Sequence, residues 1–371
     1  MTQKRLKDSN VTRKILAASL FLAVYSTFAC GPTDGMCEKW FLEKASGGIG
    51  TIWVQNEGGF HPIMRLGALF GEFGLMAVAM LGPALCLWKL ISLHGYLKGS
   101  LCWLPMVIPV GTLLGNDYSG HFGMVSNLHF TFLWYGLILL TSQKELVKAD
   151  FWVLGAGVLA GGGLCGILAP FMLLKKPFRQ AVLLCCLLGV GTLTYLGINK
   201  ITPRDFSLVS ATGEAQMNRK PSFDLSTYLA GVSAQAIVGP TFPKKEAVAF
   251  TGLIGELGLE NEQRYLWRIS GVLGAGWLLL LFGGGWRFAL GVIGCSIMTF
   301  AFSRTDRKVD LLFYPDNTQY LGWISGMLGI GAVLFITNKL AEKKAQWIAQ
   351  TLHGLSSVKC RWNRASGSDS L

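Results

Sequence analysis

Apolar segments long enough to cross a lipid bilayer recur along this chain, and they limit its fold more than any other feature. Hydrophobic residues make up 51% of the 371 residues and charged residues only 15%, and the mean hydropathy is +0.44. In a bilayer a helix satisfies its own backbone hydrogen bonds, so repeated apolar segments favour helices. The sequence therefore predicts an all-α fold, that of a polytopic helical membrane protein.

Basic residues gather near both ends of the chain and predict its orientation. Five of the first fourteen residues are Lys or Arg, and six more follow Phe335. Lys and Arg beside apolar segments favour the cytoplasmic side of a membrane, so both termini are expected to be cytoplasmic. Basic residues grouped beside apolar segments indicate orientation before they indicate a ligand, so the net charge of +12 does not imply a nucleic-acid partner. Membrane lipids are expected partners, and no nucleic acid is expected.

The apolar pattern predicts about eight full spans in a single membrane domain, residues 1–338, followed by a basic cytoplasmic tail, residues 339–371. The expected spans are 15–30, 66–91, 101–114, 124–140, 181–197, 269–281, 288–302 and 321–337. The expected external loops are 31–65, 115–123, 199–267 and 303–318. The first span also fits a secretory signal, and an uncleaved anchor is preferred because the residues near Cys30 match a cleavage site poorly.

Residues 151–174 allow two interpretations, one ordinary span or a short hairpin that enters and returns on the same side. A single span would place Lys175, Lys176 and Arg179 outside, against the tendency of basic residues to stay inside. The triple glycine 161–163 could break the segment into two short halves. The glycine-broken hairpin is therefore preferred.

Cysteines, glycines and charges inside the apolar segments have structural interpretations. The nine cysteines show no metal-ligand spacing, and no metal site is expected. Those in apolar runs, such as Cys86, are expected to act as small hydrophobic residues. Whether Cys30 and Cys37 form a disulfide is not decided by the sequence. Glycines such as Gly329 and Gly331 are expected to allow close helix packing. Glu72 is the clearest charge inside a span, and a cytoplasmic turn is expected to hold Lys89, His94 and Lys98.

The expected external segments carry acids together with arginines. They include the loop that begins at Asp34, the turn Asn116-Asp117-Tyr118, and residues 210–221 and 303–310. The cytoplasmic turns hold mostly Lys and Arg. This asymmetry favours an enzyme that opens at the outer leaflet over a transporter, which needs polar groups at mid-membrane.

The order of these elements resembles the integral-membrane glycosyltransferases of the GT-C class. The resemblance rests on Asp34-Gly35-Met36-Cys37 leading through Trp53 to Asn56-Glu57-Gly58-Gly59, on Val125 to Phe130, on Leu159 to Gly163, and on Ala211 to Glu214 followed by Arg219. It implies a polyprenyl-phosphate sugar donor, a glycan or lipid acceptor outside the cytoplasm, and the bacterial inner (plasma) membrane. The resemblance implies no firm cofactor, and it leaves undecided whether a divalent cation takes part.

Transfer of a sugar from a lipid phosphate needs a base for the acceptor hydroxyl and positive charge for the leaving phosphate. Asp34 is the expected catalytic base. The substrate-binding candidates are the cations Arg204, Arg219, Lys220, Arg304 and Arg307, which would contact phosphate, together with Asp117, Tyr118 and Trp53. Two other hypotheses remain: a non-catalytic subunit or assembly factor of a larger membrane complex, and, less favoured, a transporter.

Overall fold

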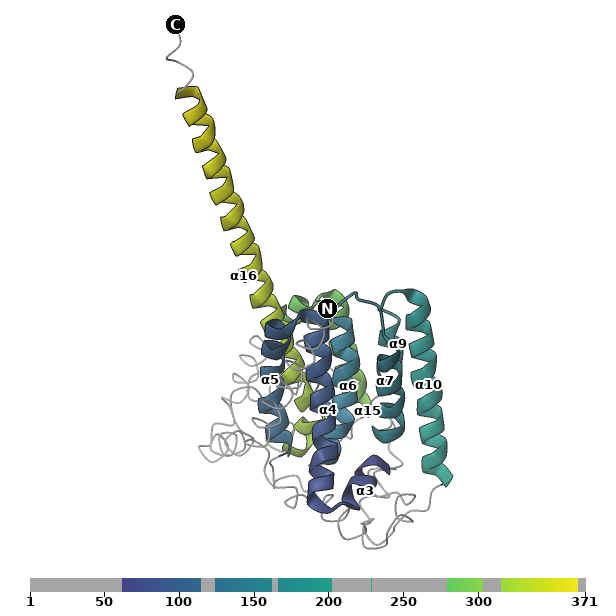
Figure 1. Ribbon diagram of the computed structural model, residues 1–371. Coiled ribbons are helices and arrows are strands. Elements are labelled where there is room, and N and C mark those ends of the chain that lie inside the picture. Colours follow the sequence, from purple (N-terminus) through teal and green to yellow (C-terminus); the bar gives the residue numbers. More distant parts are fainter. Residues whose placement is uncertain are drawn as a thin grey trace, which may run out of the picture.

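The computed structural model describes residues 62–114, 124–161, 166–201, 228, 279–302 and 315–365. Within these residues the regular structure is helical and contains no strand, which confirms the predicted all-α class. The helices form a bundle, and the last helix extends far beyond it at one end (Figure 1).

Helices occur throughout the described ranges. They are α3 (Pro62–Ala68), α4 (Gly71–His94), α5 (Tyr96–Leu114), α6 (Met124–Leu140), α7 (Lys148–Gly161), α9 (Ala169–Met172), α10 (Phe178–Ile201), the 3-10 helix η4 (Leu281–Gly284), α15 (Trp286–Phe302) and α16 (Pro315–Ala365). The helix α6 has the bounds that the sequence predicts for residues 124–140. The expected spans 101–114, 181–197 and 288–302 correspond to α5, α10 and α15 and differ from them only at their ends.

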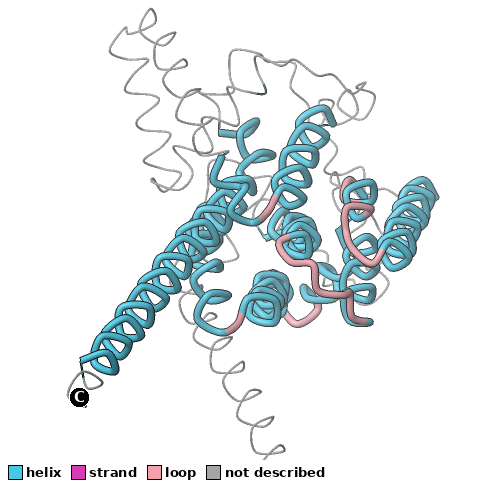
Figure 2. The backbone as a smooth tube through the Cα atoms, turned by 90° about the horizontal axis from the view of Figure 1, so that it is seen from above, coloured by secondary structure: helices cyan, strands magenta, loops and turns pink. Residues whose placement is uncertain are grey.

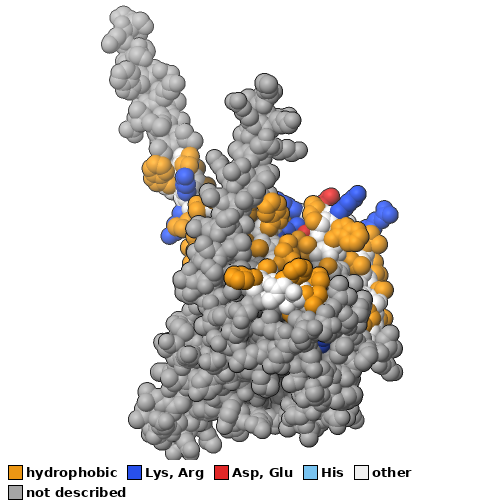
Figure 3. Space-filling view, turned by 60° about the horizontal axis from the view of Figure 1, so that its bottom comes forward, with side chains coloured by type: hydrophobic (Ala, Val, Ile, Leu, Met, Phe, Trp, Pro, Cys, Tyr) orange, Lys and Arg blue, Asp and Glu red, His pale blue; other side chains and the backbone are white. Residues whose placement is uncertain are grey.

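Chain segments far apart in sequence meet at one end of the bundle. His94, the last residue of α4, places its Nε2 atom 2.7 Å from the hydroxyl of Thr141, just after α6. Lys98 on α5 donates to the Oδ1 atom of Asn338 on α16 at 2.6 Å. We call this end the basic end, because its described cations are Lys89, Lys98, Lys144, Lys148, Lys175, Lys176, Arg179, Arg287 and Lys339. Figure 3 shows Lys and Arg side chains gathered there, above an apolar surface.

The core is formed together by buried side chains of α4, α5, α6, α7, α10, α15 and α16. Its largest fully buried side chains are Trp134, Trp323, Phe288 and Leu90. The indole N–H of Trp134 donates to the backbone carbonyl of Trp323 at 3.0 Å, so α6 and α16 are joined inside the core by a hydrogen bond as well as by packing. A buried indole needs such a partner, because an unsatisfied donor in an apolar interior is costly.

Helix α10 lies at the edge of the bundle (Figure 1). Its exposed side chains include Leu183, Val190, Leu193 and Leu196. By length and composition, one helix in the described residues could cross a membrane, residues Phe178–Ile198 with a mean hydropathy of 2.1. Shorter apolar helices cover Ala84–His94 and Trp286–Thr299.

Two glycines of the last helix confirm the predicted role in close packing. A Cβ atom at Gly329 would overlap the side chain of Pro105 on α5. One at Gly331 would lie 2.6 Å from the backbone oxygen of Leu280. Only glycine allows the backbone of α16 to come this close to α5 and to the segment before η4. The thiols of Cys86, Cys102 and Cys295 are buried, which fits the apolar role expected for cysteines in these runs.

The long span expected over residues 66–91 is interrupted. Helix α3 ends at Ala68, and α4 begins at Gly71, whose φ of +71° lies in the left-handed region that favours glycine. The N–H of Phe70 donates to the carbonyl of Gly67 at 2.9 Å and closes the turn between the two helices. Glu72 therefore belongs to the first turn of α4 and not to the interior of one continuous helix.

One other expectation needs correction, and the structure adds a detail to the tail. Lys89 lies inside α4 and is buried, whereas the sequence had suggested a position in a cytoplasmic turn. The tail after residue 338 continues α16, which is one helix of 51 residues. No Gly or Pro occurs between Gly331 and Gly354, so nothing in that stretch ends the helix. Figure 2 shows from above how far α16 extends past the bundle.

Candidate functional site

A buried ion pair joins α4 to α7 near the basic end. The Nζ atom of Lys89 lies 2.6 Å from Oδ1 and 2.8 Å from Oδ2 of Asp150, and the two side chains are 7% and 0% exposed. The hydroxyl of Tyr135 on α6 donates to Oδ1 at 2.7 Å. The carboxylate thus receives bonds from two other helices, and it ties α4, α6 and α7 together.

Asp150 also completes the start of its own helix. It is the third residue of α7, and its Oδ2 atom accepts the backbone N–H of Val147 at 3.0 Å. This bond satisfies one of the N–H groups that a helix N-terminus leaves without an internal partner. A negative charge in the first turn is also favourable to the helix dipole. Local capping therefore fixes the carboxylate where Lys89 and Tyr135 can reach it.

Two lysines from loops bind the carbonyl groups at the ends of other helices. Lys175, between α9 and α10, is buried and donates to the carbonyl of Leu139 at 2.8 Å and to that of Ser142. Lys144 donates to the carbonyl of Leu93 at 2.8 Å, near the end of α4. The last carbonyls of a helix lack internal partners and carry partial negative charge, so a lysine there is stabilising. These bonds fix the ends of α6 and α4.

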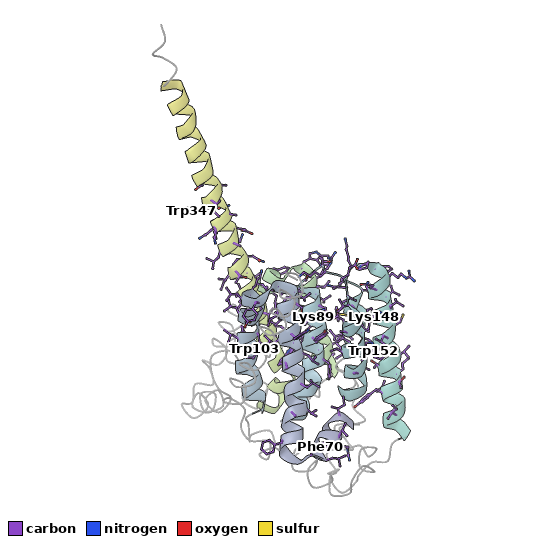
Figure 4. The ribbon with its side chains drawn as sticks, viewed as in Figure 1. Phe70, Lys89, Trp103, Lys148, Trp152 and Trp347 are labelled. Atoms are coloured by element: carbon purple, nitrogen blue, oxygen red, sulfur yellow. The ribbon has the colours of Figure 1, made fainter. Side chains whose placement is uncertain are left out.

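Positive charge exceeds negative charge in this cluster. The pKa of Lys175 is lowered from 10.5 to about 8, first by burial and then by Lys89; Asp150 raises it in part, and Arg287 lowers it. The Arg287 guanidinium lies 5.0 Å from the centre of the Trp286 ring. Lys89 and Lys148 both lie toward this end of the bundle in Figure 4.

The cluster is built to hold helices together. Asp150 is fully buried and accepts from three donors, so a substrate cannot reach it in this arrangement. Among the described residues, no group of three or more His, Cys, Asp or Glu could hold a metal ion. We therefore interpret this cluster as a structural lock, that is, a set of contacts that holds the ends of α4, α6 and α7 together at the basic end.

Several helices end or begin together at the opposite end, which is marked by Phe70 in Figure 4. Because α5 starts at the basic end, it ends here at Leu114, and α6 starts here at Met124 before it returns. Helix α10 likewise runs from Phe178 at the basic end to Ile201 here. Helix α15 runs the same way to Phe302, and α16 runs back (Figure 1).

The residues that the sequence singles out for catalysis and binding lie outside the described residues. They are Asp34, Trp53, Asp117, Tyr118, Arg204, Arg219, Lys220, Arg304 and Arg307. The structure therefore neither brings these side chains together nor separates them, and their roles stay predictions. The described ends of α5, α6, α10, α15 and α16 do place the neighbouring points of the chain at one end of the bundle.

Sequence reasoning missed the ion pair and the buried Lys175. A signal was present, because Lys89 interrupts the apolar run of residues 84–91 and Asp150 directly precedes the apolar start of residues 151–154. Charged side chains are rarely buried without a partner, so each of these positions implied an opposite charge nearby. The sequence alone could not pair two residues that lie 61 positions apart.

Comparison of the chain with protein-family models, with curated proteins and with solved structures gives no match.

Proposed function

We propose that this protein is a membrane glycosyltransferase that moves a sugar from a polyprenyl-phosphate donor to a glycan or lipid acceptor outside the cytoplasm. One observation carries the proposal: the described helix ends on both sides of residues 115–123 and 303–314, and the end of α10 that precedes residues 202–227, lie at the bundle end opposite the basic end. These three segments contain Asp117, Tyr118 and the five candidate cations. A shared end is the arrangement that joint binding of one phosphate would need.

The proposed chemistry assigns one role to each group. Asp34 takes the proton from the acceptor hydroxyl as that oxygen attacks the anomeric carbon of the sugar. The bond between that carbon and the phosphate oxygen breaks, and the polyprenyl phosphate leaves with the electron pair. Arginines such as Arg219 and Arg304 stabilise the charge on the phosphate, because a guanidinium can donate two parallel hydrogen bonds to it. Trp53 and Tyr118 contact the sugar ring of the donor.

The proposed topology has about eight spans, a short hairpin and both termini in the cytoplasm of a bacterium. The hairpin is supported by Lys175, which follows it and bonds to Leu139 and Ser142 at the end where α7 begins. Residues 148–175 therefore leave the basic end and return to it. The excess of Lys and Arg at this end fits the cytoplasmic side of a membrane.

The test is transfer by the purified full chain in lipid nanodiscs, supplied with a radiolabelled polyprenyl-phosphate hexose and a glycan acceptor. Asp34→Asn should retain donor binding and lose transfer by a factor of about 10² to 10⁴, the usual contribution of a general base. The matched control is Glu342→Gln, which neutralises an exposed carboxylate on α16 and should retain transfer. Full transfer by Asp34→Asn would rule out the assigned base.

A second candidate function is a non-catalytic subunit of a larger membrane complex. The observation that favours it is α16, which continues past the bundle as a long helix with Trp347 exposed. Purification in a mild detergent distinguishes the two functions. Stoichiometric partners with no donor binding would favour the subunit, and a stable lone chain that binds donor would favour the enzyme.

A further inference from the structure

Helix α16 leaves the bundle without a break, and the part beyond its last described contacts with the bundle is amphipathic. Asn338 is bonded to Lys98 and lies 3.5 Å from the carbonyl of Gly283, and it marks the point of departure. Side chains beyond it are solvent-exposed through residue 350. We call residues 339–350 the extension; Figure 4 labels Trp347 on it.

The apolar side chains of this region share one face of the helix. Ile336, Leu340 and Trp347 are separated by four and seven positions, which places them within about 40° of one another around the axis. Leu340 is 61% exposed and Trp347 is 66% exposed. Ile348 is also exposed but lies about 80° around the axis from Leu340, outside this face. A helix of a soluble protein normally buries such a face.

Lysines border this apolar face on both sides. With 100° per residue, Lys343 lies about 60° to one side of Leu340 and Lys344 about 40° to the other. The acid of the extension, Glu342, lies on the far side and is paired with Lys339 at 2.8 Å. Lys343 and Lys344 therefore leave an excess of positive charge next to the apolar face.

The charge pattern distinguishes between the surfaces that this face could contact. A second copy of the helix would bring Lys343 and Lys344 toward the same two lysines, and like charges at close range are unfavourable. An anionic membrane surface instead attracts both lysines, accepts Leu340 into its apolar boundary, and suits Trp347, since tryptophan favours that interface. With the bundle embedded in the membrane as proposed above, the start of the extension, next to Asn338, already lies at such a surface.

We propose that the extension binds anionic phospholipid headgroups on the cytoplasmic face of the membrane that holds the bundle. Leu340 and Trp347 enter the interface, and Lys343 and Lys344 contact the lipid phosphates. Trp347 lies nine residues beyond Asn338, about 14 Å along the axis, so the extension must incline toward the surface for it to reach the lipid. The inference rests on the membrane placement proposed above and is independent of the transfer chemistry.

The experiment uses the full chain reconstituted into phosphatidylcholine vesicles, with or without phosphatidylglycerol, that carry brominated acyl chains. Bromine quenches tryptophan fluorescence on contact, and the difference between the native chain and Trp347→Phe isolates Trp347 among the 12 tryptophans. We expect this difference signal to be quenched in the phosphatidylglycerol vesicles and much less in phosphatidylcholine alone. The double variant Lys343→Gln/Lys344→Gln should weaken the association on the order of 30-fold, from the usual contribution of two basic residues at an anionic surface.

The matched control is Lys148→Gln/Lys176→Gln, which removes two exposed lysines of the same end and should leave the quenching unchanged. Equal quenching in both lipid mixtures, or none in either, would overturn the proposal; the latter is expected if an acidic protein is the natural partner. Extraction of the vesicles with carbonate is measured in parallel. A chain that resists extraction while Trp347 stays unquenched refutes the lipid contact alone, whereas an extractable chain refutes the membrane placement.

Discussion

The buried pair of Lys89 and Asp150 gives a sharp test of the lock at the basic end. Asp150→Leu should leave the ammonium of Lys89 buried without its partner, which costs about 3–5 kcal/mol of unfolding free energy. Lys89→Met should cost an amount at the lower end of this range, because Asp150 keeps its bonds from Tyr135 and from the N–H of Val147. Both side chains are buried, so solvent can compensate little.

The double variant Lys89→Met/Asp150→Leu carries neither charge. Its remaining cost comes from the Tyr135 hydroxyl and the Val147 N–H, which lose their acceptor, and one such group costs about 1–3 kcal/mol. The double variant should therefore be more stable than Asp150→Leu alone. The reason is that a buried pair is costly to break and much less costly to replace by apolar side chains.

The assay is a titration of the chain in mixed micelles with a denaturing detergent, followed by helical circular dichroism. Maleimide labelling of the buried thiols of Cys86 and Cys102 reports opening of the core independently. The control is the exposed pair of Lys339 and Glu342, whose double-mutant coupling should stay below about 0.5 kcal/mol. If the costs of Lys89→Met and Asp150→Leu simply add in the double variant, the two residues are not coupled and the reasoning is refuted.

Two other perturbations test the packing and electrostatics of the bundle. The pKa of Lys175 is lowered to about 8, so between pH 8 and 10 the unfolded chain holds a proton that the folded chain has lost, and folding is favoured as pH rises. The unfolding free energy of the native chain should therefore rise with pH relative to Lys175→Met; a constant difference contradicts the shift. Gly157→Ala should cost about 1–3 kcal/mol because its Cβ would overlap Phe132. Gly189→Ala, with open space at its Cβ, should be neutral or stabilising; equal costs for the two would contradict the packing.

The positions of most described helices follow from the sequence, because apolar runs and the polar residues between them mark where helices start and stop. Helix α6 begins after Gly123 and ends before Thr141-Ser142-Gln143, and its bounds match the prediction. The break between α3 and α4 at Gly71 could not be predicted from the sequence. Glycines are frequent in these runs, and nothing local distinguishes one with a positive φ from one that only allows close packing.

The candidate site could be predicted only as residue types on one side of a membrane. Asp34 and Arg219 lie outside the described residues, so their meeting in space remains a prediction. The lock shows why such pairings escape sequence reasoning. Lys89 and Asp150 are brought together by the packing of α4 on α6 and of α6 on α7, and no local pattern encodes the register of either contact.

The positions of the buried charges also bear on the transporter hypothesis. A transporter needs polar groups near mid-membrane on broken helices. Lys89 lies five residues before the end of α4, and Asp150 lies in the first turn of α7, so both are close to the basic end. Lys175 binds carbonyls at the end of α6. Within the described part of the chain these three charges lie near helix ends, whereas the buried polar side chains inside α15, Ser296 and Thr299, are uncharged, and the Ser296 hydroxyl lies 2.5 Å from that of Tyr228. None of these three charges therefore supplies the mid-bundle charged group on which a transporter could rely.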